Sequence, residues 1–250
     1  MNPMLTEGYF KNMKDVLQKI EDTQLEAIYK SAQLILQCIQ NGGIWHLMDT
    51  GHMLMYEGVG RTGGIMAVRP VKVAVEVSNP TRYREADVVK PKVFMNEIKG
   101  LPEYVIKKSN MQSVDVLMIG SVSGIDTLPV EMALRARQMG LIVIGLTSVE
   151  YSKFLEPQHD SGRKLYEICD VVLDNCCSVG DTLVYVEELE QGICPASGIA
   201  ASYIMWAIQS RLVELLLKNG KKPHIYISNH MPGADLRNGQ ARAEYEKLGY

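Results

Sequence analysis

The 250-residue sequence lacks the features of several specialised classes of protein. Its longest apolar runs, at residues 114–120 (with one Asp) and 141–146, are far shorter than the ~20 residues that a membrane-spanning helix needs. The first 14 residues mix Glu, Lys and Asn and contain no apolar block or cleavage site, so no secretory signal is expected. These absences predict a cytoplasmic protein without a membrane partner.

The sequence also lacks a strong charge of either sign. Its formal net charge of −3 argues against nucleic acid as a partner, so any anion-binding site must be local. There are five cysteines, an odd number, without a Cys-x-x-Cys pair or the histidine spacing of a zinc finger. We therefore expect reduced thiols, no metal site and no cofactor.

Hydrophobic residues make up 46% of the chain, in runs that alternate between helical spacing and the continuous pattern of buried strands. This alternation predicts a parallel sheet covered by helices on both faces, with ligands bound beyond the carboxyl ends of the strands. The expected helices lie at 4–39, after the turn at 49–52 to about Gly60, at 127–140 and at 200–219. The expected strands lie at 44–48, 114–120, 141–147 and 171–173. A further unit is expected to start near 71–77, before an exposed polar segment at 79–87, and residues 225–227 are a candidate last strand.

The turn at residues 121–127, Ser-Val-Ser-Gly-Ile-Asp-Thr, lies between an expected strand and an expected helix. Free backbone N–H groups and the positive end of the helix dipole face any anion bound at such a position. Serine hydroxyls supply neutral donors, and glycine lets the backbone approach a phosphate closely. The alternative is an ordinary helix N-cap made by Asp126 or Thr127. Spacing alone leaves both interpretations open.

Several motifs, in their order along the chain, resemble those of SIS (sugar isomerase) proteins. The Ser-x-Ser-Gly turn is followed by Pro-Val-Glu-Met-Ala at 129–133, and further matching stretches lie at 146–153, 159–165 and 170–175. The chain is similar, from its N-terminal helices to about Asn238, to SIS proteins related to phosphoheptose isomerases.

This resemblance implies an α/β fold, a three-layer αβα sandwich with a central five-stranded parallel sheet of flavodoxin-like type. It implies a single domain over residues 1–250, with N-terminal helices at 1–40 that pack on the core or on a partner subunit of a homodimer or homotetramer. It also implies a phosphorylated sugar as ligand. The residues expected to hold it are Ser121, Ser123, Gly124, Asp126 and Thr127, with Thr50 and Gly51 from the turn after the first strand.

Two positions depart from the family pattern. The turn at residues 48–52 keeps little of the usual Gly-, Ser- and His-rich sequence. Asp126 replaces the usual Thr or Asn and puts a carboxylate beside the expected phosphate. At ~4 Å two like charges repel by roughly 1 kcal/mol in bulk water and by more near a protein surface. Asp126 is therefore expected either to turn away as a helix cap or to indicate a less charged ligand.

Aldose–ketose isomerisation needs a group that takes a proton from the carbon next to a carbonyl, and a second group at the oxygen. Glu57, expected within the helix after the first turn, is the candidate base, although it could be an ordinary exposed glutamate. His52 opens the same helix and is a candidate catalytic or ligand-binding residue. His159 matches a family histidine and could act as an acid, contact the sugar, or cap a helix starting near Ser161.

These residues favour a phosphosugar isomerase or a related lyase or etherase. A non-catalytic phosphosugar sensor is the alternative that the altered first turn supports. A third interpretation is an assembly protein whose fold serves subunit contacts.

Overall fold

A computed structural model describes residues 4–50, 53–76, 95, 98 and 100–250. The long helices are α1 (Leu5–Gln40), α3 (Thr127–Gln138), α5 (Ser197–Lys218) and α6 (Ala234–Leu248), and the shorter ones are α2 (Leu101–Lys108), α4 (Val149–Phe154), η2 (Leu165–Glu167) and η3 (Glu187–Leu189). The strands are β1 (Trp45–Asp49), β2 (Val68–Pro70), β3 (Val116–Gly120), β4 (Ile142–Thr147), β5 (Val171–Asp174), β6 (Val184–Val186) and β7 (Gln191–Ile193). Within this described part, no helix combines the length and apolar character needed to cross a membrane.

The central sheet has five parallel strands in the order β2-β1-β3-β4-β5. In its register Asp49 of β1 lies opposite Gly120 of β3, and Thr147 of β4 lies opposite Asp174 of β5. Four strands therefore end together at one edge of the sheet. This is the flavodoxin-like strand order, so the expected fold class is confirmed.

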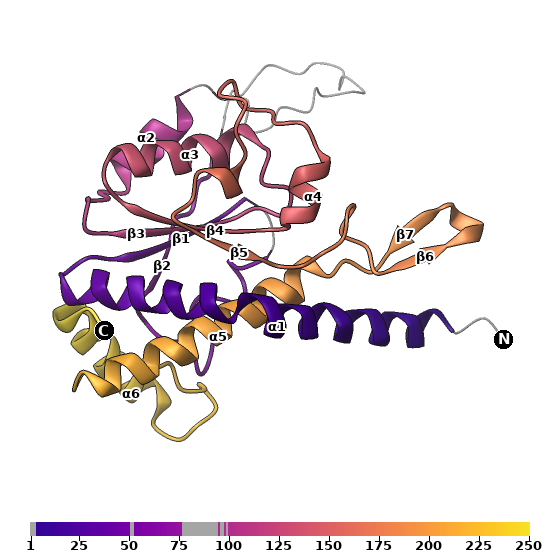
Figure 1. Ribbon diagram of the computed structural model, residues 1–250. Helices are drawn as coiled ribbons and strands as arrows, with labels where there is room; N and C mark the ends of the chain where they lie inside the picture. Colours follow the sequence, from indigo (N-terminus) through magenta and orange to yellow (C-terminus); the bar gives the residue numbers. More distant parts are fainter. Residues whose placement is uncertain (1–3, 51–52, 77–94, 96–97, 99) are drawn as a thin grey trace, which may run out of the picture.

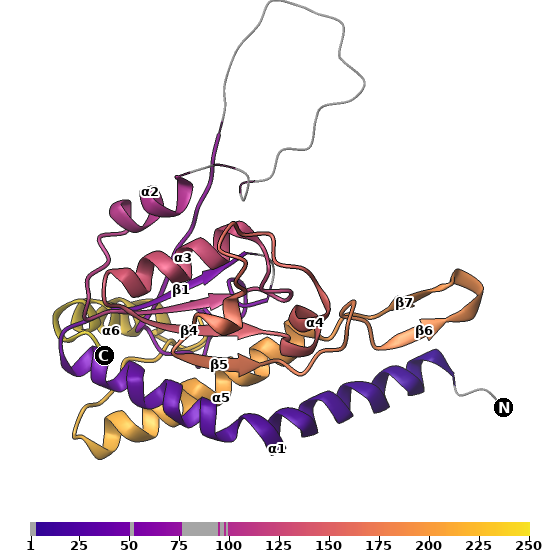
Figure 2. The same cartoon turned by 45° about the horizontal axis from the view of Figure 1, so that its top comes forward.

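Helices cover both faces of the sheet (Figure 1). Successive strand residues point to opposite faces. Leu117 and Ile119 of β3 pack in one apolar cluster with α2 and α3, whereas Val116 and Met118 pack in a second cluster with α1 and α5. Because both sets are buried, β3 is apolar at every position before Gly120. Figure 2 shows the resulting three layers from a second direction.

A single helix of 36 residues, α1, forms where the sequence predicts N-terminal helices. One part of it packs against α5, and its first turns run past the body beside the β6–β7 hairpin (Figures 1 and 2). The helix ends at Gln40, one residue beyond the expected bound, and Asn41-Gly42-Gly43 follow it. Gly42 has a left-handed φ of 77°, and a Cβ on Gly43 would lie 2.6 Å from the carbonyl oxygen of Val114.

Three expectations about individual elements are wrong. Residues 53–60 form turns and bends instead of a helix, since Gly58 and Gly60 are poor helix formers. Residues 225–227 form no strand, because only Ile225 pairs, in an isolated bridge. The unit expected near 71–77 begins earlier, with β2. The polar segment at 79–87 lies outside the described residues.

Candidate functional site

The loop at residues 121–127 joins β3 to α3 at the edge where the strands end together. Its carbonyl groups are bonded to two neighbouring segments. The Ser148 N–H and the Thr147 hydroxyl donate to the carbonyl of Val122, at 2.9 and 3.0 Å, and the Leu165 N–H donates to that of Gly124, at 2.8 Å. These bonds fix the path of the loop.

The loop's N–H groups, in contrast, are available to a ligand. Within the described part of the chain, the backbone N–H groups of Ser123, Ile125, Asp126 and Thr127 have no hydrogen-bond acceptor. They lie at the N-terminus of α3, where the helix dipole adds partial positive charge. An anion with several oxygens can satisfy such groups together.

Gly124 allows the loop to pass close to β4. Its φ is 63°, and a Cβ at this position would lie 2.7 Å from the Thr147 hydroxyl oxygen. Ser121 is buried, and its hydroxyl oxygen accepts the Gly124 N–H at 3.2 Å. Ser121 therefore shapes the loop, and only glycine fits at position 124 without displacing Thr147.

Asp126 occupies the N-cap position of α3, but its side chain accepts no capping hydrogen bond. The interpretation of this turn as a side-chain helix cap is therefore wrong for Asp126. Its carboxylate instead bonds the Ser123 hydroxyl. Burial raises the pKa of Asp126, and the Ser123 hydrogen bond opposes part of that rise. Thr127, the other candidate cap, directs its hydroxyl to the carbonyl of Gln158 at 3.4 Å.

The turn after β1 begins at Thr50, beside the end of β3. The Thr50 N–H donates to the carbonyl of Gly120 at 3.1 Å, which joins the ends of β1 and β3. Gly51 and His52 lie outside the described residues. Glu57 follows in the irregular stretch, half-buried, and forms an ion pair with Arg61 at 3.1 Å. The expected helical position of Glu57 is therefore wrong.

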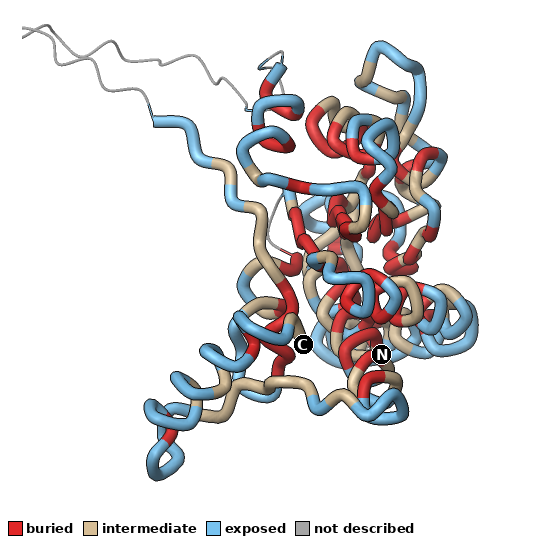
Figure 3. Tube along the Cα trace, turned by 90° about the vertical axis from the view of Figure 1, so that its left-hand side faces the viewer, coloured by how far each residue is buried: buried red, intermediate tan, exposed pale blue. Residues whose placement is uncertain are grey.

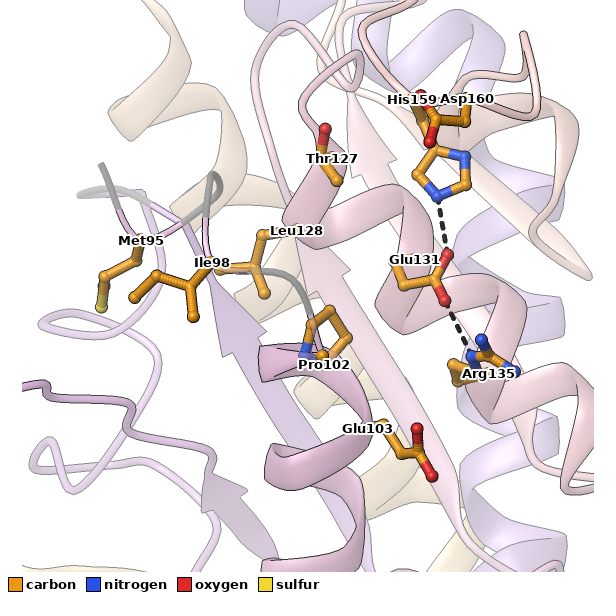
Figure 4. A pocket seen from close by; sticks show the side chains of 11 residues that line it. Met95, Ile98, Pro102, Glu103, Thr127, Leu128, Glu131, Arg135, His159 and Asp160 are labelled. Carbon is orange, nitrogen blue, oxygen red and sulfur yellow. Dashed lines mark hydrogen bonds and ion pairs between the residues drawn. The ribbon is translucent and has the colours of Figure 1, made fainter. Parts of the chain in front are cut away.

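A pocket of about 390 Å³ lies between α2 and α3 (Figure 4). Residues that line it include Pro102, Thr127, Leu128, Glu131, Arg135 and His159. Glu57 instead lines a separate, open hollow beside α5, together with Tyr56, Tyr203 and Trp206. The structure therefore places Thr127 of the loop and His159 at one pocket, and Glu57 at another.

In the first pocket, His159 pairs with Glu131 of α3, with 2.6 Å between Nε2 and Oε2. The other carboxylate oxygen accepts from Nε of Arg135 at 2.7 Å. The Ser161 N–H donates to Nδ1 of His159 at 3.1 Å, so Nδ1 is an acceptor and Nε2 carries the hydrogen donated to Glu131. No helix begins near Ser161 in the described chain, so His159 is not a helix cap.

Sequence reasoning missed the part that Glu131 plays in this pocket. The available signal was spacing, because Thr127, Glu131 and Arg135 are four residues apart and share one face of α3. The partner His159 follows 28 residues after Glu131, in a loop, and no local pattern joins the two. Among the described residues, no group of three or more His, Cys, Asp or Glu side chains could hold a metal ion.

An α/β sandwich with an N–H-rich loop after its central strand is a fold suited to binding small anions. A family profile described as "SIS domain" matches residues 8–148. The UPF0309 protein BH3325 of Halalkalibacterium halodurans is 32% identical over 241 residues, which are 96% of this chain and 97% of the relative. The chain therefore belongs to the SIS domain family and, within it, to the UPF0309 proteins.

Solved structures with a similar fold include protein c3406 of E. coli CFT073, determined in complex with a ligand. It aligns with a TM-score of 0.51 at 13% identity, over 86% of this chain and 93% of that one. The phosphoheptose isomerase GmhA from Neisseria gonorrhoeae aligns with a TM-score of 0.49 at 16% identity, over 83% and 97%. At 13% identity, the c3406 structure shows that this chain has a similar fold.

Proposed function

We propose that this protein binds a phosphorylated sugar, with the phosphate at loop 121–127. The observation that carries the proposal is the group of four backbone N–H donors without acceptors, at Ser123 and residues 125–127. A phosphate group has enough oxygens to accept from several of them, and the dipole of α3 favours its negative charge. Membership of the SIS domain family supports a sugar as the remainder of the ligand.

The side chains around this loop add to the proposed binding site. The Ser123 hydroxyl bonds Asp126 and the Thr127 hydroxyl donates to Gln158, so in this proposal each exchanges that partner for a phosphate oxygen when the ligand binds. Ser121 and Gly124 keep the loop in the conformation that exposes the N–H groups. We propose that Thr50 and Gly51, after the neighbouring strand, contact the sugar. In this proposal the protein works in the cytoplasm as a homodimer or homotetramer.

We propose aldose–ketose isomerisation, or a related lyase or etherase reaction, as the activity. All of these reactions move a proton beside a sugar carbonyl, which requires a carboxylate or imidazole near the bound ligand. A non-catalytic phosphosugar sensor is the second candidate. The observation that favours it is the position of Glu57, which is paired with Arg61 in a hollow apart from the loop.

A thermal-shift screen tests the binding proposal. The ligands are pentose, hexose and heptose phosphates, with the unphosphorylated sugars as controls. A ligand at 100 times its Kd adds about 2.7 kcal/mol to the free energy of unfolding, which is a clear shift. We expect a shift that requires the phosphate and is reduced in Ser123→Ala, but not in Ser178→Ala, which changes an exposed serine elsewhere. Absence of any phosphate-dependent shift would contradict the proposal.

Turnover separates the two candidate activities. Each phosphosugar that binds is incubated with the protein, and its aldose and ketose forms are followed by NMR. Interconversion supports the isomerase. Saturable binding without conversion of any bound sugar supports the sensor.

A further inference from the structure

A groove of about 480 Å³ lies between residues 222–225 and helix α6. This α6 groove shares no lining residue with the pocket beside α3. Its helical wall is one face of α6, which carries Arg237, Gln240, Ala241 and Glu244 at helical spacing. Most residues of α6 are exposed, as Figure 3 shows for the helix that ends beside the C label. The proposed phosphosugar site gives the groove no role.

One backbone edge of the extended segment that forms the other wall is already paired, with residues 63–66. The carbonyl of His224 accepts a hydrogen bond from that stretch at 2.9 Å, and the N–H of Tyr226 donates one to it at 3.0 Å. Ile225 lies between them at an isolated antiparallel bridge. Backbone groups of successive residues in such a pairing point to opposite edges. The N–H and carbonyl of Ile225 therefore point to the other edge.

A side chain of α6 indicates the kind of partner that this second edge accepts. Asn238 bonds Ile227, two residues further along the same edge, with both ends of its amide. Oδ1 accepts from the Ile227 N–H, and Nδ2 donates to the Ile227 carbonyl, each at 3.0 Å. The amide thus takes the place of a neighbouring strand.

The same two groups of Ile225 are available to a ligand. Ala241 follows Asn238 by three residues on α6 and has no polar side-chain atom. Within the part of the chain that the structure describes, neither the N–H nor the carbonyl of Ile225 has a hydrogen-bond partner. A peptide backbone, which carries a donor and an acceptor in each residue, is the group that pairs with such an edge.

The charges of the groove favour an acidic peptide. Lys222 and Arg237 line it, and neither side chain forms an ion pair with another described residue. Glu244 also lines the groove, but it is paired with His224 at 3.0 Å. Residues 221–250 contain five Lys and Arg against three Asp and Glu, whereas the whole chain has a net charge of −3. This surface therefore attracts anionic partners that the rest of the chain repels.

We propose that the α6 groove binds a short acidic peptide in an extended conformation. The backbone of one peptide residue pairs with the N–H and carbonyl of Ile225. Acidic side chains on either side of that residue pair with Lys222 and Arg237. The backbone bonds fix where the peptide lies, and the two cations select acidic sequences. This site is independent of the proposed phosphosugar function.

Fluorescence anisotropy with labelled peptides tests the proposal. The probes are Glu-Val-Glu-Val-Glu, the corresponding Lys-Val peptide, and the acidic peptide with N-methylated backbone amides. We expect saturable binding of the acidic peptide and none of the Lys peptide. The N-methylated peptide should bind about 10-fold more weakly, because methylation removes the donor that pairs with the Ile225 carbonyl.

Two variants test the role of the cations. Lys222→Gln and Arg237→Gln should each weaken binding of the acidic peptide about 2- to 5-fold, as expected for exposed ion pairs, and the difference should shrink as salt rises. Lys247→Gln is a matched control, because it removes the same charge from α6 outside the groove. It should bind the peptide with the original affinity.

Amide hydrogen exchange, followed by NMR, reports on the backbone pairing itself. Exchange at Ile225 should slow when the acidic peptide is bound. Exchange at Ile227 should not change, because Asn238 already accepts from that N–H.

The proposal is overturned if the acidic peptide does not bind, or if its N-methylated form binds equally well. Equal affinity of Lys222→Gln, Arg237→Gln and the Lys247→Gln control would also overturn it, because charge would then not select the ligand. Displacement of the peptide by an equal concentration of succinate would show that the groove recognises charge alone, and would overturn the backbone pairing.

Discussion

Replacing Asp126 by Asn removes one negative charge from the start of α3 and keeps the shape of the side chain. The amide oxygen of Asn can still accept the hydrogen bond from the Ser123 hydroxyl. The four unsatisfied N–H groups also stay in place, since none depends on the carboxylate. The substitution therefore changes the charge near the proposed phosphate site and little else.

The expected gain in affinity follows from Coulomb's law. Two unit charges at ~4 Å repel by about 1 kcal/mol in water and by about 4 kcal/mol at an effective dielectric constant of 20. Asp126 is half-buried, so a value near the lower limit, about 1–2 kcal/mol, is appropriate. We expect Asp126→Asn to bind a sugar phosphate roughly 5 to 30 times more tightly. The difference should shrink as salt rises, because ions screen exposed charges.

Isothermal titration calorimetry at low and high salt provides the measurement. Asp15→Asn is a matched control, because it removes the same charge from an exposed position on α1, where Asp15 pairs with Lys11. Weaker binding by Asp126→Asn would refute the reasoning, since the carboxylate would then contact the ligand or a cation bound with it.

Stability gives a second measurement on the same variant. The pKa of Asp126 is raised in the folded chain, so the native state favours the protonated acid. The group stabilises the fold fully below its unfolded pKa, near 3.8, and this contribution is lost as pH rises through the folded pKa. Asp126→Asn should therefore raise the melting temperature at neutral pH relative to the original chain, and the difference should disappear below about pH 3.8.

Three further changes test the scaffold. Gly124→Ala introduces a Cβ at a left-handed φ, 2.7 Å from the Thr147 hydroxyl oxygen. Denaturant titration should therefore show that the free energy of unfolding falls by about 1–3 kcal/mol. An unchanged free energy of unfolding would contradict the loop geometry. Asp181→Ala removes a carboxylate that accepts hydrogen bonds from the N–H and the hydroxyl of Ser197 at the start of α5. The free energy of unfolding should fall by about 1–2 kcal/mol. Asp160→Ala, which removes an exposed carboxylate, is the control and should lower it less. Burial raises the pKa of Cys38 to about 12, and its side chain is only 3% exposed. A thiol reagent at pH 8 should therefore label Cys38 only after unfolding, and rapid labelling of this residue in the folded chain would contradict its burial.

The fold follows from the sequence because strands buried on both faces must be continuously apolar. Residues 116–120 and 141–146 have this pattern and form β3 and most of β4, close to the expected bounds. The long periodic run that ends at Asn41-Gly42-Gly43 likewise forms α1. Residues 53–60 do not follow their apolar pattern. Their apolar spacing suits a helix, but two glycines remove the conformational preference for it, and a short segment has little else to stabilise one.

The loop was predictable in its position, and its detailed bonding was not. Ser-x-Ser-Gly between a strand and a helix indicates an anion site by a local rule. Whether Asp126 caps α3 or bonds Ser123 depends on side-chain orientation, which the sequence does not encode locally. The pairing of Glu131 with His159 is a contact across 28 residues, and it exists because the loop that carries His159 packs against the N-terminal end of α3.

The length of α1 has a consequence for the hydrodynamic behaviour of the chain. At 1.5 Å per residue, 36 helical residues measure about 54 Å. A compact chain of 250 residues has a radius of gyration of ~18 Å, equivalent to a uniform sphere roughly 46 Å across. A rod longer than that sphere must extend beyond it. The protein should therefore diffuse more slowly and scatter X-rays as a more elongated particle than its mass alone would suggest.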